Sequence, residues 1–403
     1  MDMSGEASSK SQAHLNKGLL LALVFCSFST GPLGVLISLF LRPIAIDFGV
    51  EVGVMGQINT FSSVAAVALA LVMGFLSIRF RHKSLLVTGL FFFAVSSVGC
   101  FFSSGFVAML LAYSISGVGL AMVNPMVNSL VGEHFSIDRR AKAVGWTVGA
   151  GALAYVFGPL ILNFLSDFGG WRFSLLGFVI PLLFVSIVLA FFGIPSVSRG
   201  QETALSQDSF LSGFKGVLSC KSAWACLAGD TLRAASFSAV LYYGVAFFME
   251  RFRASTYDGA LILLVAASCY TFGGLVSGPF IDRVGRKPFT AITALLAGSF
   301  TVSFVFVPNF WFSLLLNLAA GVVFGMFTAA AISLTLEQVP AYRGTMMSVD
   351  SAFVNLGYAL GAAVGGIALF IGFGYEGLGA SLGLFGIVAA VVFYAFARDP
   401  TRK

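Results

Sequence analysis

The chain has 403 residues, of which 58% are hydrophobic and only 10% are charged, and its mean hydropathy is +0.96. Because a soluble domain carries roughly 25% charged residues, this composition excludes a protein that exposes most of its surface to water. The sequence holds no nucleotide-binding loop, metal-ligand cluster or catalytic triad, and its five cysteines are scattered. We therefore expect neither an enzyme nor a bound metal or other cofactor.

Long apolar runs recur along the whole chain. Runs of about 18 or more apolar residues indicate membrane spans, since ~20 helical residues cross a ~30 Å hydrocarbon core and a helix satisfies its own backbone hydrogen bonds. We predict an all-α integral membrane protein with twelve transmembrane helices in two six-helix bundles. The first bundle (18–194) has spans at 18–41, 54–78, 84–103, 106–131, 143–165 and 173–194, and the second (223–397) has spans at 223–248, 259–281, 289–307, 311–336, 345–371 and 377–397.

Three polar segments flank these bundles: an N-terminal tail (1–17), a linker (195–222) and a C-terminal tail (398–403). The first tail precedes a span too long for a signal-peptide core, so we interpret it as uncleaved. Of the 23 Lys and Arg residues, 18 lie on the side of these segments, four lie on the other side, and Arg233 lies within a span. Positive residues favour the cytoplasmic side. We therefore expect a multi-pass protein of the cell membrane with both termini cytoplasmic, and a net charge of +6 that reflects topology rather than a nucleic-acid partner.

A ten-residue pattern occurs twice, 204 positions apart. The offset matches three residues of the first copy with three of the second: Gly74, Arg79 and Lys83 with Gly278, Arg283 and Lys287. It also pairs Glu133-x5-Arg139 with Glu337-x5-Arg343. The chain therefore consists of two copies of one unit, and hydrophobic halves repeated in this way are typical of transporters.

The second copy reads Gly278-Pro-Phe-Ile-Asp282-Arg283-Val-Gly285-Arg286-Lys287 and follows the eighth span. With six plus six spans and a central linker, it resembles the loop signature of the major facilitator superfamily, over about residues 17–398. The resemblance implies secondary active transport of a small molecule by alternating access, by a monomer in the lipid bilayer. Gly158-Pro159 resembles part of a signature of the drug:proton antiporters, although Leu162 and Asn163 replace its two closing glycines.

The repeated pattern is also a candidate gate, formed by Gly74, Arg79, Gly278, Asp282, Arg283, Gly285, Arg286 and Lys287. Gly285 permits a tight turn, and Asp282 suits the positive N-terminus of a facing helix. By the resemblance, that helix is the fifth. The first copy has Ile78 in place of the Asp and Arg81 in place of the Gly, so we expect an unequal latch. In that copy we favour a purely topological role for the basic residues.

Small residues recur at every fourth position in the second, fifth, eighth and eleventh spans. They are Ala66, Ala70 and Gly74; Ala150, Ala154 and Gly158; Gly274 and Gly278; and Gly357, Gly361 and Gly365. Such stripes let helices pack closely. The resemblance places these four helices at the moving interface between the halves, so the stripes predict that the halves slide or rock there.

Charged residues inside spans are costly and therefore informative. Asp230 and Arg233 are three apart and share one face of the seventh span. They predict either a structural ion pair or a coupling unit in which Asp230 exchanges a proton while Arg233 engages substrate. Asp350 lies about one and a half turns inside the eleventh span, where we expect it to cap the cytoplasmic end or to pair with Arg79 rather than to take a coupling role.

The resemblance implies that helices 1, 4, 7 and 10 line the central cavity. The candidate substrate-binding residues on them are Ser27, Thr30, Asn124, Asn128, Arg233, Phe237, Asn317, Phe324 and Thr328. A cavity rich in Phe and poor in polar groups favours proton-coupled efflux of amphipathic compounds. The alternative is uptake of a polar or anionic nutrient by symport or facilitated diffusion, supported by Arg233. A receptor or scaffold that does not transport is the weakest alternative.

Overall fold

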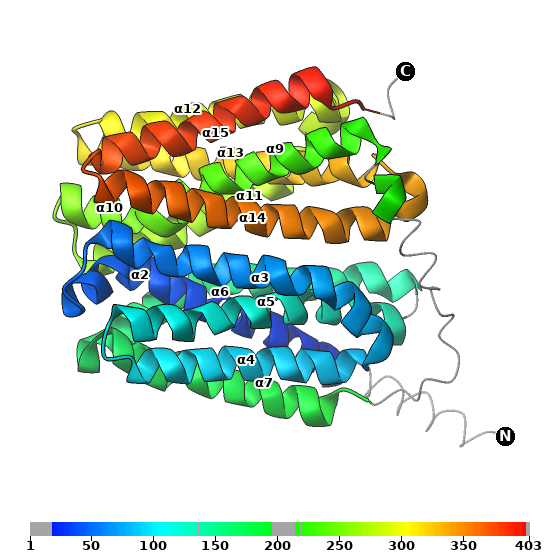
Figure 1. Ribbon diagram of the computed structural model, residues 1–403, viewed down its shortest axis with the longest axis horizontal. Helices are drawn as coiled ribbons and strands as arrows, with labels where there is room; N and C mark the ends of the chain where they lie inside the picture. Colours follow the sequence, from blue (N-terminus) through cyan, green and yellow to red (C-terminus); the bar gives the residue numbers. More distant parts are fainter. Residues whose placement is uncertain (1–17, 136, 196–213, 218, 400–403) are drawn as a thin grey trace.

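The computed structural model describes residues 18–135, 137–195, 214–217 and 219–399, and every regular element within them is a helix (Figure 1). The first half contains a span over Gly18–Asp47 that includes α2 (Pro32–Asp47), then α3 (Val52–Arg79), α4 (His82–Phe102), α5 (Phe106–His134), α6 (Ile137–Ser174), η1 (Leu175–Val179) and α7 (Ile180–Gly193). The second half contains α9 (Lys221–Ser238), η2 (Ala239–Tyr243), α10 (Gly244–Arg251), α11 (Thr256–Val284), α12 (Arg286–Phe306), α13 (Phe310–Leu336), η3 (Pro340–Tyr342), α14 (Arg343–Phe370) and α15 (Gly374–Phe396).

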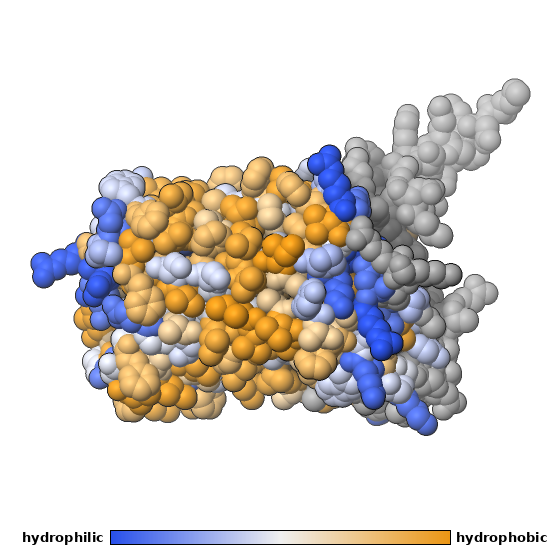
Figure 2. Space-filling view, turned by 90° about the horizontal axis from the view of Figure 1, so that it is seen from above, coloured by the Kyte–Doolittle hydropathy of each residue, from blue (hydrophilic) through white to orange (hydrophobic). Residues whose placement is uncertain are grey.

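Within the described residues, eleven helical stretches are long and apolar enough to span a membrane. The longest, Ala143–Gly193, has 51 residues, far more than the ~20 that one crossing needs. It is broken at Gly169 and Gly170, where Gly170 has a φ of 68°. After the break, α7 returns alongside α4, so this stretch crosses twice. The predicted twelve-helix, all-α architecture is confirmed, and Figure 2 shows its hydrophobic band between two hydrophilic ends.

The internal repeat is preserved in the helix boundaries and in the contacts at one end of the molecule. Adding 204 to the bounds of α4 gives those of α12, and adding it to the starts of α3 and α5 gives the starts of α11 and α13. His82 pairs with Glu133 between α4 and α5, and at the same offset Arg286 Nη1 lies 3.9 Å from Glu337 Oε1.

The lysines of the two copies also occupy matching places. Lys83 Nζ donates to the carbonyls of Phe191 and Ile194, at 2.7 and 2.6 Å, and so caps the end of α7. Lys287 Nζ lies 5.7 Å from the ring centroid of Tyr394 on α15. A purely topological role is therefore wrong for Lys83, because a free helix end offers carbonyl groups that a cation satisfies.

We call the end of the molecule that holds Gly18, Arg79 and Asp399 the basic end, and the opposite end the distal end. At the distal end the halves are in close contact, since a Cβ added to Gly53 on α3 would meet the backbone of Gly366 on α14. At the basic end a Cβ added to Gly145, Gly149 or Gly278 would meet no atom within 4 Å. In Figure 1, α3 and α14 diverge toward this end. The halves are therefore in contact at the distal end, and α3 and α14 separate toward the basic end.

Several small residues of the predicted stripes approach helices of their own half. A Cβ at Gly357 would meet the carbonyl of Thr231, and one at Gly117 would meet the backbone beside Ala66. A Cβ at Gly31 would meet Ala154. The helices that carry the stripes do form the interface between the halves, where α3 contacts α14 and α6 contacts α11, so sliding between them stays a prediction.

Gly285 joins α11 to α12 with a φ of 101° and a ψ of 149°, a conformation that is strained for any residue with a Cβ. Gly285→Ala is expected to reduce the free energy of unfolding by about 1–3 kcal/mol. The matched control is Arg81→Ala, because Arg81 holds the equivalent position in the first half with an ordinary φ of −66°. Thermal unfolding in detergent measures both, and equal melting temperatures would contradict the expectation.

Candidate functional site

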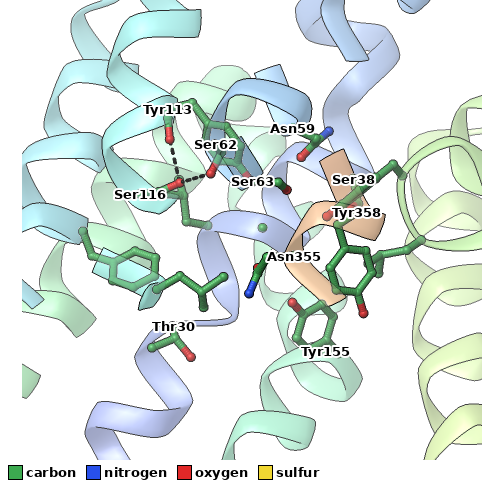
Figure 3. Close-up of a pocket in the computed structure, with 16 residues that line it drawn as sticks. Thr30, Ser38, Asn59, Ser62, Ser63, Tyr113, Ser116, Tyr155, Asn355 and Tyr358 are labelled. Atoms are coloured by element: carbon green, nitrogen blue, oxygen red, sulfur yellow. Dashed lines mark hydrogen bonds between the residues drawn. The ribbon is translucent and has the colours of Figure 1, made fainter. Parts of the chain in front are cut away.

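A cavity of about 140 Å³ lies between the two halves (Figure 3). Its lining is mostly hydroxyl, amide and tyrosine side chains, and it contains no charged residue. The residues are Thr30, Leu33, Gly34, Ser38, Asn59, Ser62, Ser63, Phe93, Tyr113, Ser116, Leu120 and Tyr155 from the first half, with Leu241, Tyr242, Asn355 and Tyr358 from the second. The cavity therefore suits an uncharged ligand that combines flat apolar faces with hydrogen-bonding groups.

Irregular helical segments shape two walls of this cavity. The first span breaks at Thr30 and Gly31, just before Pro32, which has no N–H to continue the hydrogen-bond ladder. Across the cavity, the π-helical turn η2 carries Tyr242, and such insertions re-aim side chains and are frequent at functional sites. Both irregularities present polar groups to the cavity that a regular helix would aim elsewhere.

Two polar atoms of the lining have no hydrogen-bond partner among the residues that the structure describes. Ser38 Oγ and Asn59 Nδ2 are buried and unpaired, whereas Ser62 and Ser116 pair with each other at 3.0 Å. A buried polar group without a partner is costly, and most in native proteins are satisfied. Because Ser38 and Asn59 both line the cavity, their unused bonding capacity points to a ligand there.

A buried charged cluster occupies the second half, away from the cavity. Asp230 is 0% exposed and Arg233 is 3% exposed. Arg233 Nε donates to Asp230 Oδ1 at 2.7 Å, and its Nη1 donates to Thr328 Oγ1 at 3.0 Å. Thr335 Oγ1 donates to Asp230 Oδ2 at 3.2 Å, and Tyr270 donates to Thr328 at 3.0 Å. The two predicted residues do form an ion pair, but Arg233 is engaged within its own half.

Asp350 belongs to this cluster, which corrects the predicted role as an end cap or partner of Arg79. It is 3% exposed and interacts electrostatically with both Asp230 and Arg233. Its Oδ1 accepts no hydrogen bond from the described residues. The sequence position suggested the membrane surface, but α14 packs closely on α9 through Gly357 and brings Asp350 beside Asp230.

Aromatic rings join the charged cluster to the centre of the second half. Phe237 stacks on Tyr270 with a centroid distance of 5.0 Å and lies 5.0 Å from Phe324. Tyr358 lines the cavity and interacts electrostatically with Arg233. The cluster is thus connected to the cavity wall through Tyr358, without opening into it.

The other predicted substrate residues are dispersed. Of the nine, only Thr30 lines the cavity. Ser27 is buried, Asn124 and Asn128 are exposed, and Asn317 is buried with an unpaired Nδ2 that faces Gly244.

The predicted gate residues lie at the basic end, where Gly278, Asp282 and Arg283 are exposed. The latch between Asp282 and the fifth helix belongs to the opposite conformation and stays a prediction. Gly285 makes the turn that the sequence indicated, with its positive φ.

Comparisons with known proteins identify the family. The model of the Major Facilitator Superfamily matches residues 19–271 and 258–403. The chain belongs to this superfamily. Members of the major facilitator superfamily are secondary transporters that move small molecules by alternating access, so this protein is a multi-pass membrane transporter and not an enzyme.

Relatives in the superfamily differ in what they carry. A probable 4-methylmuconolactone transporter of Cupriavidus pinatubonensis is 26% identical over 371 residues, which cover 89% of this chain and 83% of that protein. The synaptic vesicular amine transporter of Mus musculus is 23% identical over 369 residues, 89% and 68% of the two chains. The solved structure of a D-xylose-proton symporter matches with a TM-score of 0.77 at 19% identity, over 95% and 98%. A bacterial homologue of the human lysosomal transporter Spinster, inward-facing and occupied, matches with a TM-score of 0.77 at 18% identity, over 94% and 96%.

The unpaired amide of Asn59 generates a prediction that separates stability from function. Asn59→Leu is expected to raise the free energy of unfolding by about 1 kcal/mol, because it removes a buried polar group that has no partner, while transport is lost. Ser97→Ala is the control, since Ser97 Oγ is buried outside the cavity and donates to Phe93 O at 2.9 Å; it should lower stability. Thermal unfolding in detergent is the measurement, and a destabilised Asn59→Leu protein would contradict the ligand-binding interpretation.

Proposed function

We propose that this protein exports small amphipathic compounds across the cell membrane in exchange for protons. The observation that carries the proposal is a titratable cluster, Asp230 with Arg233, that is buried inside the span region and lies apart from an uncharged cavity between the halves. Ionisable residues kept at such cost within a membrane are typical of ion and proton pathways. A separate uncharged cavity leaves the substrate to be recognised by hydrogen bonds and aromatic faces.

The cavity lining supports an amphipathic substrate. Tyr113, Tyr155, Tyr242 and Tyr358 combine a flat apolar ring with a hydroxyl group, and Phe93 adds an apolar wall. Such residues bind ligands that have one apolar and one polar side. The synaptic vesicular amine transporter is one relative whose named substrate class fits this description in part.

Uptake of a polar nutrient is the second candidate function. It is favoured by the number of hydroxyl and amide groups in the cavity and by the fold match to a D-xylose-proton symporter. An anionic nutrient is less well supported, because Arg233 is already bound to Asp230 and Thr328. The substrate residues are then Ser38, Asn59 and their neighbours in the cavity, with Thr30, rather than Arg233.

The orientation that the basic residues predict determines which side of the membrane each end of the molecule faces. With both termini cytoplasmic, the structure is the inward-open state, and the contact of Gly53 with Gly366 closes the outer end. We propose that the reverse motion closes the basic end through Asp282 and the N-terminus of α6, with Gly74, Arg79, Gly278, Arg283, Arg286 and Lys287 supporting the two loops. The protein acts as a monomer in this proposal, because the cavity is complete within one chain.

Coupling can be tested in proteoliposomes. Cells expressing the protein are first grown on a panel of toxic amphipathic compounds, with uptake of labelled sugars and other nutrients in parallel, to find a transported solute. Reconstituted wild-type protein should then accumulate that solute against its gradient when a pH gradient is imposed. Asp230→Asn should abolish this accumulation but retain downhill exchange, because the buried cluster then keeps a single carboxyl group beside Arg233 and has no shared proton to exchange. Full proton-driven accumulation by Asp230→Asn would contradict the proposed coupling. Uptake of a labelled nutrient without resistance to any toxic compound would favour the second function.

The latch proposal concerns the closed basic end. Asp282→Asn should slow transport at least severalfold with an unchanged melting temperature, because the exposed side chain holds no packing in the open state and would meet the α6 N-terminus only on closure. Single-turnover exchange of the transported solute measures the rate. An unaltered rate would eliminate the latch.

A further inference from the structure

Two carboxyl groups and a single guanidinium group share one buried space between α9 and α14. Asp230 and Arg233 extend from α9, and Asp350 extends from α14 and interacts with both. All three are at most 3% exposed. If both carboxyl groups were ionised, the cluster would hold one uncompensated negative charge without access to water, which is strongly unfavourable. One bound proton makes the cluster neutral.

The hydrogen bonds indicate which carboxyl group holds that proton. Asp230 has two donors, Arg233 Nε on its Oδ1 and Thr335 Oγ1 on its Oδ2, so both of its oxygens already accept a hydrogen bond. Asp350 Oδ1 has no donor among the described residues. A protonated Asp350 can donate to Asp230, whereas an ionised Asp350 can only repel it.

The surrounding elements offer few other titratable groups. Cys226 on α9 lies near both carboxyl groups, and Tyr358 on α14 and Tyr270 on α11 lie near Arg233. From α13 the cluster receives the hydroxyl groups of Thr335 and Thr328. Charged groups acting on Asp350 among the described residues are Asp230 and Arg233 alone.

We propose that Asp350 is the proton-carrying residue of this transporter, with Asp230 remaining ionised against Arg233. The inference rests on the proposed proton coupling and moves the exchangeable proton from the seventh span to the eleventh. When Asp350 releases its proton, two carboxylates compete for Arg233. Arg233 is then attracted toward Asp350 and away from Thr328. That movement releases the Thr328–Tyr270 pair, which lies beside the rings of Phe237 and Phe324. Release of the proton from Asp350 thus changes the contacts of Arg233 with α13 and α14, and α14 also lines the cavity through Asn355 and Tyr358.

The arrangement of helices supports a role in the conformational cycle. Asp350 lies on α14, the helix whose other end contacts α3 of the first half through Gly366. Thr231 Oγ1 of α9 donates to the carbonyl of Phe353 on α14 at 3.1 Å, so the two helices are tied together beside the cluster. A change in the charge of Asp350 therefore acts on α14, which forms part of the interface between the halves.

The test uses purified full-length protein in lipid nanodiscs and infrared difference spectroscopy across a pH titration. Wild-type protein should show a buried carboxylic acid band that titrates. Asp350→Asn should lose this band while Asp350→Glu restores it, and Asp167→Asn, which changes an exposed aspartate, should leave it unchanged. Retention of the whole band in Asp350→Asn would overturn the assignment, since a structural Asp350 does not titrate.

Transport in proteoliposomes distinguishes this inference from the proposed function. Asp350→Asn should lose proton-driven accumulation to the level of downhill exchange, with a melting temperature close to that of the wild type, because the Asp230–Arg233 pair stays neutral. Proton-driven accumulation in both wild type and Asp350→Asn would overturn the inference alone. A third outcome is wild-type transport that does not respond to a pH gradient, together with loss of the infrared band in Asp350→Asn. This outcome would reject proton coupling, and it would retain the proton shared by Asp230 and Asp350.

Discussion

The absence of hydrogen-bonding solvent in the hydrocarbon core is the constraint on which the rest of this structure depends. Backbone groups are satisfied within helices, and many hydroxyl groups bond back to their own helix, as Ser97 does to Phe93 and Thr301 does to Ala297. Against this background, a polar atom with no partner or a buried charge is conspicuous. Ser38 and Asn59 at the cavity and Asp350 in the charged cluster are among these exceptions, together with Ser96, Ser236 and Asn317, which do not line the cavity.

The two halves share a backbone plan but divide the chemistry between them. The first half supplies most of the hydroxyl and amide groups of the cavity, and the second half contains the buried ionisable cluster. The same division is visible at the basic end. Glu133 pairs with His82, whereas its counterpart Glu337 pairs with Arg286, a residue that is always charged. A repeated contact can therefore be kept in geometry while its electrostatic character differs between the copies.

Separation of charge from the cavity limits what the transporter can recognise. Arg233 would offer a strong site for an anion only if it left Asp230 and Thr328. In the present arrangement, Tyr358 lines the cavity and also interacts electrostatically with Arg233. A substrate that contacts Tyr358 in the cavity can thus influence the charged cluster through this one side chain. Substrate binding and protonation are then linked by a short physical path.

The sequence by itself determined the number of spans, the two-fold repeat, the turn at Gly285 and the pairing of Asp230 with Arg233. These features follow from local or regular properties: the length of apolar runs, a fixed offset, a positive φ and the spacing of three residues on one helix. Tertiary structure alone decided the membership of the two sites. Ser38 and Asn59 belong to no recognisable sequence pattern. Asp350 is predicted to lie at the cytoplasmic end of its span, but the packing of α14 on α9 brings it beside Asp230. Contacts between helices far apart in the chain depend on side-chain packing in three dimensions, which no spacing along the sequence encodes.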